Sequence, residues 1–485
     1  MDTEIKQNKE LQLWEALIPV VALIGMLAFN VFVFGDSALG GSNQFVLLLG
    51  ASVAAIIGFK NKISYKSMMD EVAENVKSTA GAIFILLMVG ALAGTWLISG
   101  VIPSMIYYGL QILSPAIFLP ATLIICSVIS IATGSSWTTS ATVGIALIGI
   151  GGALGFDKGM IAGAVISGAY FGDKLSPMSD TTNLAPAMAG TDLFTHIRYM
   201  TLTTIPTYII TFILFVILGL TFDAEGTVET ASLLADIKAS FNVSLWLFIV
   251  PVVVIGLIVK KTEPLIALLI GTLLGGAFAL IFQPNIVLML SGATEMNFTS
   301  AYKGIMNAIT TKSVIPTENT TLADLFTSGG MEKMLGTIWL ILCAMVFGGI
   351  MDAIGALSCI SQSLLKLAKS TFGLFASTVG SCLALNITAS DQYLAIVVPG
   401  KMFAQAYKDK GLAPENLSRT IEDSGTVTSV LIPWNTCGAY HAGTLGVGTF
   451  ELLPYAFFNL ISPIMTLIFA AFNIKIKQLT SGIEK

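Results

Sequence analysis

Apolar runs of about 20 residues recur along the whole chain, and this feature limits what the chain can fold into. A helix needs about 20 mostly apolar residues to cross the hydrocarbon core of a bilayer. The 485 residues are 55% hydrophobic and only 11% charged, whereas a soluble domain carries about 25% charged residues. We therefore predict an all-α polytopic membrane protein with about 12–14 transmembrane helices. The candidate spans are 14–34, 44–59, 79–99, 114–134, 135–155, 158–190, 198–222, 241–259, 263–283, 335–358, 371–390, 391–408, 418–446 and 452–473.

The placement of basic residues predicts the orientation of these spans, because cytoplasmic loops are enriched in Lys and Arg. If the N-terminus is inside and the spans alternate, the inner segments hold most of the 24 basic residues, and Lys174 falls within a span. The pattern predicts a multi-pass protein of the cytoplasmic (inner) membrane with both termini inside. The basic residues of the outer segments are Lys158, Lys238, Lys303, Lys312 and Lys333.

Two polar stretches divide the chain. Residues 223–240 are acidic and are expected to link two membrane halves on the outer side, and residues 291–334 are expected to form an outer loop. The predicted units are a first membrane repeat at 1–222, the linker at 223–240 and a second membrane repeat at 241–485.

The two halves resemble each other weakly at an offset of about 256 residues, which pairs Pro177 with Pro433 and Ser135 with Asp391. Seven predicted spans in each half give corresponding segments opposite orientations, as in the inverted repeats of secondary transporters. In such proteins the substrate site lies at the midplane, where interrupted helices of the two repeats meet. The sequence therefore predicts two inverted repeats with broken helices at the midplane.

The strongest polar cluster is GAYFGDKLSPMSDTTNLAP (168–186), which lies between apolar flanks. Pro177 lacks an amide hydrogen and predicts an interrupted helix. A charge at the bilayer centre costs at least about 2.5–3.5 kcal/mol and marks a functional site by default. Carboxylate and hydroxyl oxygens are hard ligands, which suit a hard cation such as Na⁺. The predicted Na⁺ ligands are Asp173, Asp180, Thr181 and Asn183.

A matching cluster at 419–440 surrounds Pro433, and two smaller clusters occupy 133–142 and 386–393. Glu422 is expected near the inner surface. The predicted ion or proton sites are Asp173, Asp180, Asp423 and Asp391. The residues predicted to contact substrate are Ser135, Ser136, Ser176, Thr181, Thr182, Asn183, Thr428, Asn435 and Thr436.

Motifs of other protein classes are missing from the sequence. It has no Walker A loop, HExxH motif or nucleophile elbow, so neither ATP-driven pumping nor catalysis is predicted. No basic tract indicates nucleic acid, and five scattered cysteines without a CxxC pair predict neither a disulfide framework nor a zinc site. No cofactor is expected, and His196 is expected at the inner surface.

The segments 166–197 (ISGAYFGDKLSPMSDTTNLAPAMAGTDLFTHI) and 422–440 (EDSGTVTSVLIPWNTCGAY) resemble the two signature segments of the NhaC family of sodium/proton antiporters. The resemblance extends over residues 14–472 and includes WLISGVIPSMIYYGLQI (96–112). It implies exchange of Na⁺ for H⁺, although the family also includes malate/lactate antiporters; a homodimer is expected by analogy alone. Family members often have a proline after EDSGTVTS, and Val430 in its place loosens the helix break expected before Pro433.

Na⁺/H⁺ antiport is the first hypothesis. Burial favours a protonated carboxyl group and a bound cation favours the carboxylate, so one carboxyl group can hold either H⁺ or Na⁺, and this competition couples the two flows. Asp173 and Asp180 are the predicted exchanging groups. The neutral ligands and the partners from the other repeat would be Thr181, Thr182, Asn183, Asp423, Asn435 and Thr436.

Two other hypotheses remain. The hydroxyl-rich segment 133–142, Lys174 and two broken-helix N-termini could hold a small carboxylate, which favours an exchanger of organic acids coupled to Na⁺ or H⁺. A channel would need rings of ligands from several subunits, which two duplicated clusters in one chain do not resemble. The expected partners are thus Na⁺, H⁺, membrane lipid and, under the second hypothesis, a small carboxylate.

Overall fold

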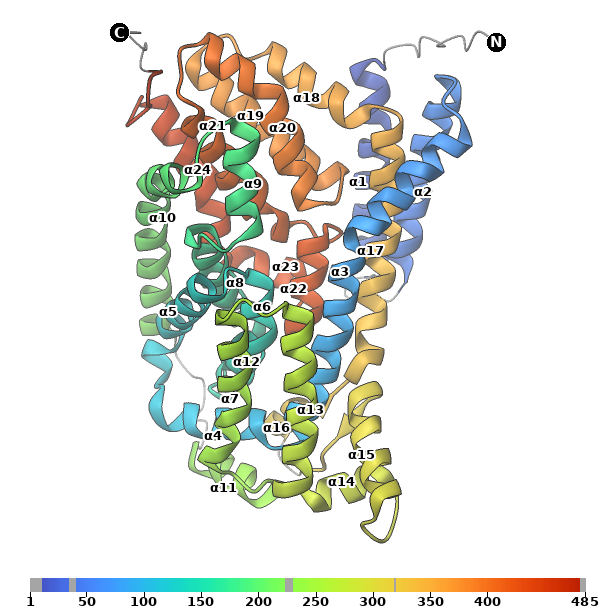
Figure 1. The fold of residues 1–485 in the computed structure, drawn as a ribbon, viewed down its shortest axis with the longest axis vertical. Helices are drawn as coiled ribbons and strands as arrows, with labels where there is room; N and C mark the ends of the chain where they lie inside the picture. The colour runs from blue at the N-terminus through green and yellow to red at the C-terminus, as the bar shows by residue number, and fades with distance from the viewer. Residues whose placement is uncertain (1–10, 35–40, 223–229, 318–319, 480–485) are drawn as a thin grey trace.

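The computed structural model describes residues 11–34, 41–222, 230–317 and 320–479, and nearly all of them are helical (Figure 1). The N-terminal part contains α1 (Leu13–Phe34), α2 (Ser42–Lys60), α3 (Tyr65–Ile98), α4 (Val101–Ile112), α5 (Pro115–Thr133), α6 (Ser136–Thr139), the π-helix η2 (Ser140–Gly144), α7 (Ile145–Ala153), α8 (Lys158–Leu175), α9 (Asp180–Ala189) and α10 (Leu193–Thr221).

The central part is a set of shorter elements. They are α11 (Thr230–Ser240), η3 (Leu245–Phe248), α12 (Ile249–Val259), α13 (Pro264–Phe282), α14 (Pro284–Ser291), α15 (Phe298–Thr310), β1 (Ser313–Val314), α16 (Thr320–Leu325) and β2 (Thr327–Ser328). The two strands pair antiparallel, with Ser313 opposite Ser328.

The C-terminal part follows without a long loop. It contains α17 (Gly330–Ala353), α18 (Ala356–Lys366), α19 (Thr371–Thr388), α20 (Gln392–Asp409), α21 (Pro414–Ile421), the π-helix η4 (Glu422–Thr426), η5 (Ser429–Leu431), α22 (Thr436–Leu445), α23 (Thr449–Leu452), η6 (Leu453–Tyr455) and α24 (Phe457–Ala471).

Eight helices in the described part of the chain are long and apolar enough to cross a membrane, or up to ten if two bent helix pairs each count as one span. The chain is therefore a multi-pass membrane protein. The predicted number of 12–14 is higher because several predicted spans consist of shorter helices. The segment 158–190 is divided into α8 and α9, and 418–446 is divided into α21, η4, η5 and α22.

The two predicted polar stretches contain regular structure. The expected loop at 291–334 includes α15, α16 and the two-stranded sheet. The predicted linker is helical over α11, and its residues 223–229 lie outside the described ranges.

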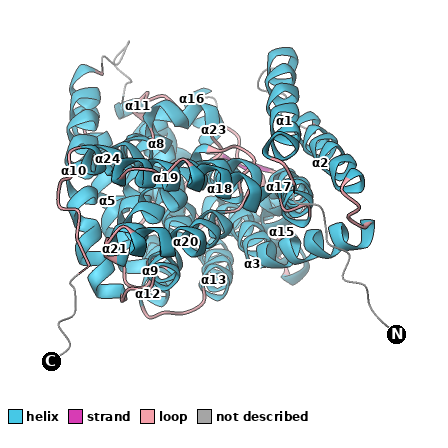
Figure 2. Cartoon of the chain, turned by 90° about the horizontal axis from the view of Figure 1, so that it is seen from above, coloured by secondary structure: helices cyan, strands magenta, loops and turns pink. Residues whose placement is uncertain are grey.

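Close helix packing depends on small residues, as is common where membrane helices approach one another. Helix α17 packs against α3 and α2, while α5 packs against α8 and α10. A Cβ atom added at Gly94 of α3 would stand 1.9 Å from the carbonyl oxygen of Ala308 in α15. Figure 2 shows α1 and α2 at one side of the molecule and α10, α5 and α24 at the opposite side.

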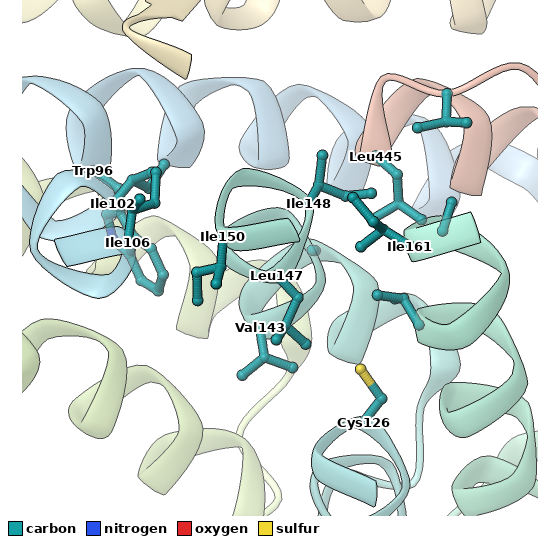
Figure 3. Close-up of a cluster of buried hydrophobic side chains, with 14 of the residues drawn as sticks. Trp96, Ile102, Ile106, Cys126, Val143, Leu147, Ile148, Ile150, Ile161 and Leu445 are labelled. Carbon is teal, nitrogen blue, oxygen red and sulfur yellow. The ribbon is translucent and has the colours of Figure 1, made fainter. Parts of the chain in front are cut away.

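The largest apolar core joins the first half of the chain to α22. Figure 3 shows part of it, where Trp96, Ile102 and Ile106 lie near the ends of α3 and α4 and Ile148 lies near Leu445 of α22. Apolar side chains also cover much of the outer surface, including Phe32 and Ile281, as expected for a surface in contact with lipid.

Candidate functional site

Four capped helix N-termini lie at a cavity of about 480 Å³, and the start of α13 lines it as well, with Lys261 and Glu263. Helices α6 and α9 come from the first half of the chain, and α20 and α22 come from the second half. Each helix begins where it does because a polar side chain caps it by accepting a backbone N–H, as Ser, Asp and Asn commonly do. The four capping residues are Ser135, Ser179, Asp391 and Asn435.

Three carboxylate groups lie where these positive helix ends converge. Asp173 at the end of α8 is 7% exposed and accepts a 3.1 Å hydrogen bond from the backbone N–H of Ser136. Asp391 caps α20 through a 3.0 Å bond from the N–H of Leu394. Asp180 is the first residue of α9 and is exposed to the cavity. Because helix N-termini favour negative charge, this arrangement can hold carboxylates ionised next to a cation.

The structure brings seven of the predicted site residues to this cavity. Hydroxyl groups provide most of the remaining polar lining. Thr138, Ser179, Gln392 and Tyr393, which are not among the predicted site residues, add to it. The seven predicted residues are Ser135, Ser136, Asp173, Asp180, Thr181, Asp391 and Thr436.

Three other predicted residues hold the segment between α8 and α9 in place and do not line the cavity. The Ser176 hydroxyl donates to the carbonyl of Ile131, and the Thr182 hydroxyl donates to the carbonyl of Lys174 at 3.1 Å. Asn183 is exposed, and its amide donates to the carbonyls of Pro177 and Ser179. These bonds hold the non-helical segment 176–179 in place.

Asp423 does not line the cavity. Its carboxylate forms a fully buried ion pair with Lys174 and also accepts hydrogen bonds from Thr203 (2.8 Å) and Thr466. The pair thus joins α8 and η4 to α10 and α24. Lys174 is 0% exposed and does not line the cavity, so it is not placed to hold a substrate carboxylate there.

The helix interruption in the second half forms without the family proline. Val430 lies in the short helix η5, and Ile432 after it is extended, with φ −102° and ψ 115°. Asn386 donates to the carbonyl of Gly425 and to the hydroxyl of Thr428, and its own oxygens accept from Asn435. Thr428 and Asn435 are therefore structural partners of this interruption and lie outside the cavity lining.

Two residues expected at the inner surface are buried. Glu422 is 0% exposed, and its only hydrogen-bonded oxygen accepts from the hydroxyl of Thr181 at 3.1 Å. His196 is also 0% exposed and shares a 2.8 Å hydrogen bond with Ser418. This burial could not be predicted from the local sequence, because it comes from the packing of η4 and α10 against α21 and other helices.

A stacked aromatic pair lies at the edge of the cavity lining. Trp137 of α6 lines the cavity and stacks on Tyr440 of α22, with ring centroids 3.9 Å apart. The Tyr440 hydroxyl donates to the Trp137 carbonyl, and one turn further the hydroxyl of Ser140 meets His441 at 2.9 Å. These contacts connect α6 and η2 of the first half to α22 of the second.

Within the described residues, no group of three or more His, Cys, Asp or Glu side chains could hold a metal ion. The oxygens that line this cavity are those of carboxylate, hydroxyl and amide side chains. Such a mixed oxygen shell suits a hard cation of low charge.

Comparison with known proteins identifies relatives over most of the chain. Residues 168–474 match the Na⁺/H⁺ antiporter family. The chain is 37% identical to the Na⁺/H⁺ antiporter NhaC of Alkalihalophilus pseudofirmus over 422 residues, which cover 87% of this chain and 88% of the relative. It is 35% identical to the malate-2H⁺/Na⁺-lactate antiporter of Bacillus subtilis over 453 residues, which cover 93% and 92%. It is 36% identical to NhaC of Bacillus subtilis over 406 residues, which cover 83% and 86%. The chain belongs to the Na⁺/H⁺ antiporter family.

Proposed function

We propose that the protein is a secondary active transporter that exchanges Na⁺ for H⁺ across the cytoplasmic membrane. The observation that carries the proposal is the cavity in which the N-termini of α6, α9, α20 and α22, from both halves, meet Asp173, Asp180 and Asp391. Two of the relatives are named as Na⁺/H⁺ antiporters. The proposal places both termini inside, on the distribution of basic residues alone, because residues 1–10 and 480–485 lie outside the described ranges.

The proposed Na⁺ ligands are oxygens of Asp173, Asp180 and Thr181, which line the cavity together. Asn183 was predicted with them, but its amide is bonded to two backbone carbonyls. We therefore propose that Asn183 stabilises the junction between α8 and α9. We propose that Asp391, which lines the cavity and caps α20, contributes negative charge next to the bound cation.

The proposed proton site is Glu422. An ionised carboxylate without a charged partner is very costly to bury, and Glu422 is fully buried with one neutral hydrogen bond. A neutral, protonated side chain avoids this cost. Because the hydroxyl of Thr181 contacts both Glu422 and Ser179, it connects this group to the Na⁺ ligands.

The proposed architecture is a pair of inverted repeats. The order of elements from α3 to α10 matches the order from α17 to α24, and the equivalent helices α4 and α18 lie at opposite ends of the long axis (Figure 1). Residues with positive φ recur at the predicted offset, in the pairs Gly100 and Gly355, Gly134 and Ser390, Gly155 and Gly411, and Gly190 and Gly446. The cavity lies where both pairs of equivalent helices, α6 with α20 and α9 with α22, begin.

A second candidate function is exchange of a small organic acid coupled to Na⁺ or H⁺. The cavity volume of about 480 Å³ is far larger than a single Na⁺ requires. Its helix N-termini and hydroxyl groups could bind a carboxylate. One relative is named as a malate-2H⁺/Na⁺-lactate antiporter.

Three substitutions in proteoliposomes test the primary proposal. Asp173→Asn and Asp180→Asn should each abolish Na⁺-driven proton movement while leaving the thermal unfolding temperature within a few degrees of the unmodified protein. Asp409→Asn, at an exposed carboxylate outside the cavity, is the matched control and should exchange normally. Normal exchange by both cavity variants would refute the assignment.

A further inference from the structure

Buried polar side chains gather along α21, a helix that does not line the cavity. Every residue of α21 after Pro414 is buried, although Glu415, Ser418 and Arg419 are polar or charged. Figure 1 shows α21 toward the end of the long axis that lies opposite α11 and α14. Polar groups are costly to bury unless they have hydrogen-bond partners, so the partners of these side chains need to be identified.

Several of these polar atoms have no partner within the described part of the chain. They are Oε2 of Glu415, all three guanidinium nitrogens of Arg419 and Nε2 of His196. The Arg419 side chain is fully buried next to the rings of Tyr199 and Phe469, whose centroids lie 4.7 and 5.7 Å from its guanidinium carbon. Because buried polar atoms are nearly always bonded to protein or to ordered water, we expect these atoms to bind water.

One end of this buried cluster reaches the surface of the molecule. Glu415 forms an ion pair with Lys477, whose side chain is 49% exposed. Lys477 belongs to the C-terminal strap, residues 475–479, which runs along the start of α21. The carbonyl of Lys477 accepts hydrogen bonds from the backbone N–H of Ala413 at 3.0 Å and from the amide of Asn416 at 2.7 Å. A half-exposed side chain therefore covers Glu415 where the cluster meets solvent.

The other end of the cluster reaches Glu422. The backbone continues from α21 into η4 with helical angles at Glu422 (φ −70°, ψ −45°). Ser418 and Glu422 are four residues apart, so their Cβ atoms are about 5–6 Å from each other on one helix face. The Ser418 hydroxyl shares a 2.8 Å hydrogen bond with Nδ1 of His196. Glu422 accepts from Thr181, which lines the cavity, so buried polar groups connect the strap with the cavity.

We propose that the polar groups along α21 form a proton path between Glu422 and the inner surface. His196 and Ser418 are the relay in the middle of this path, and water at Glu415 and Arg419 completes it. The inference rests on the proposed function, which makes Glu422 the proton site and places the C-terminus inside.

The path gives H⁺ a route that differs from the route of Na⁺. When Na⁺ binds in the cavity, the carboxyl group of Glu422 gives its proton to water and becomes a carboxylate. The imidazole of His196 accepts a proton at one ring nitrogen and releases one from the other, as histidine does in proton shuttles. The released proton passes to bulk water at the C-terminal strap, and no Na⁺ has to leave the cavity for this to happen.

Deuterium exchange at the imidazole Cε1 position of the unmodified full-length protein in D₂O, read by mass spectrometry, tests water access to the path. The chain has two histidines, His196 and His441. Both are 0% exposed and each shares a hydrogen bond with a serine, so burial alone predicts similar rates. The path predicts exchange at least about tenfold faster at His196 than at His441. Equal rates, or faster exchange at His441, would overturn the path.

Flux measurements in proteoliposomes test the relay. His196→Leu should slow Na⁺-driven proton movement about tenfold while ²²Na⁺/Na⁺ exchange keeps its rate, because Na⁺ does not use the path. His196→Gln can still bond to Ser418 but cannot relay a proton, and it should be equally slow. His441→Leu is the matched control, since it removes the other buried histidine, and it should leave the ratio of the two fluxes unchanged. Thermal unfolding of each variant checks that it is folded.

Two flux results would overturn the relay. Normal proton movement in His196→Gln would exclude proton transfer through the imidazole ring, and equal slowing of both fluxes in His196→Leu would indicate a structural role. Absence of Na⁺-driven proton movement in the unmodified protein would instead refute the proposed exchange. Slow deuterium exchange at His196 in a protein that exchanges Na⁺ for H⁺ would refute the path alone.

Discussion

Removal of one partner of the buried Lys174–Asp423 pair should destabilise the protein more than removal of both. Breaking a buried pair typically costs about 3–5 kcal/mol because an unpaired charge remains, whereas apolar replacement of both partners is often neutral. In Lys174→Met, Asp423 keeps hydrogen bonds from Thr203 and Thr466, so we expect about 3 kcal/mol. In Asp423→Leu, Lys174 keeps a 3.4 Å contact with Ser462 and lies 5.7 Å from the ring centroid of Phe458, but no carboxylate pairs with it, so we expect about 5 kcal/mol.

The double variant should lose less stability than either single variant, which gives a coupling energy of about 5 kcal/mol or more. Thermal and denaturant unfolding in detergent, followed by tryptophan fluorescence, would measure the four proteins of the cycle. The exposed pair Lys77–Glu74, also an ion pair at 3.0 Å, is the control cycle and should show about 0.2–1 kcal/mol. Additive effects of Lys174→Met and Asp423→Leu, within about 0.5 kcal/mol, would refute the reasoning.

Three further predictions test packing and the site. Gly94→Ala should lower stability by about 1–3 kcal/mol, because the new Cβ meets the carbonyl of Ala308, whereas Gly81→Ala in the same helix meets nothing within 4 Å and should not destabilise it in the same unfolding assay. Trp137→Ala should raise Na⁺ leak through proteoliposomes in the absence of a proton gradient, because the stack on Tyr440 is lost; unchanged ²²Na⁺ leak would count against a closing role for the stack. Glu422→Gln should abolish Na⁺-driven proton movement while ²²Na⁺/Na⁺ exchange persists; persistence of proton movement would remove Glu422 as the proton site.

Much of the fold could be predicted from hydropathy alone, because lipid requires long apolar helices with internally satisfied backbones. The bounds of α1, α5 and α13 lie within a few residues of the predicted spans. The number of spans could not be obtained in this way. Pro177 and Pro433 mark interruptions, but the sequence does not show that α8 and α9 separate at 176–179 or that η4 is a π-helix, since these depend on tertiary hydrogen bonds.

The site residues could be predicted where charged and polar side chains occur within apolar spans. They could be predicted less well where the direction of a side chain determines what it contacts. Asp173, Asp180 and Thr181 line one cavity, as residues of a common cluster should. Asp423 and Glu422 are neighbours in the chain, and we predicted Asp423 as an ion or proton site and Glu422 near the inner surface. The structure pairs Asp423 with Lys174, whereas Glu422 contacts Thr181 of the cavity wall. That difference follows from the direction of each side chain on η4, which only packing determines.

The most direct test of the central claim is Na⁺-induced proton movement in proteoliposomes that contain an internal pH dye, with and without malate or lactate. The proposed antiport predicts a pH change that Na⁺ alone drives. This change should be the same size with and without the organic acid, and it should be lost in Asp173→Asn. A pH change that occurs only when malate or lactate is present would contradict Na⁺/H⁺ antiport as the primary activity and would favour the organic-acid exchanger.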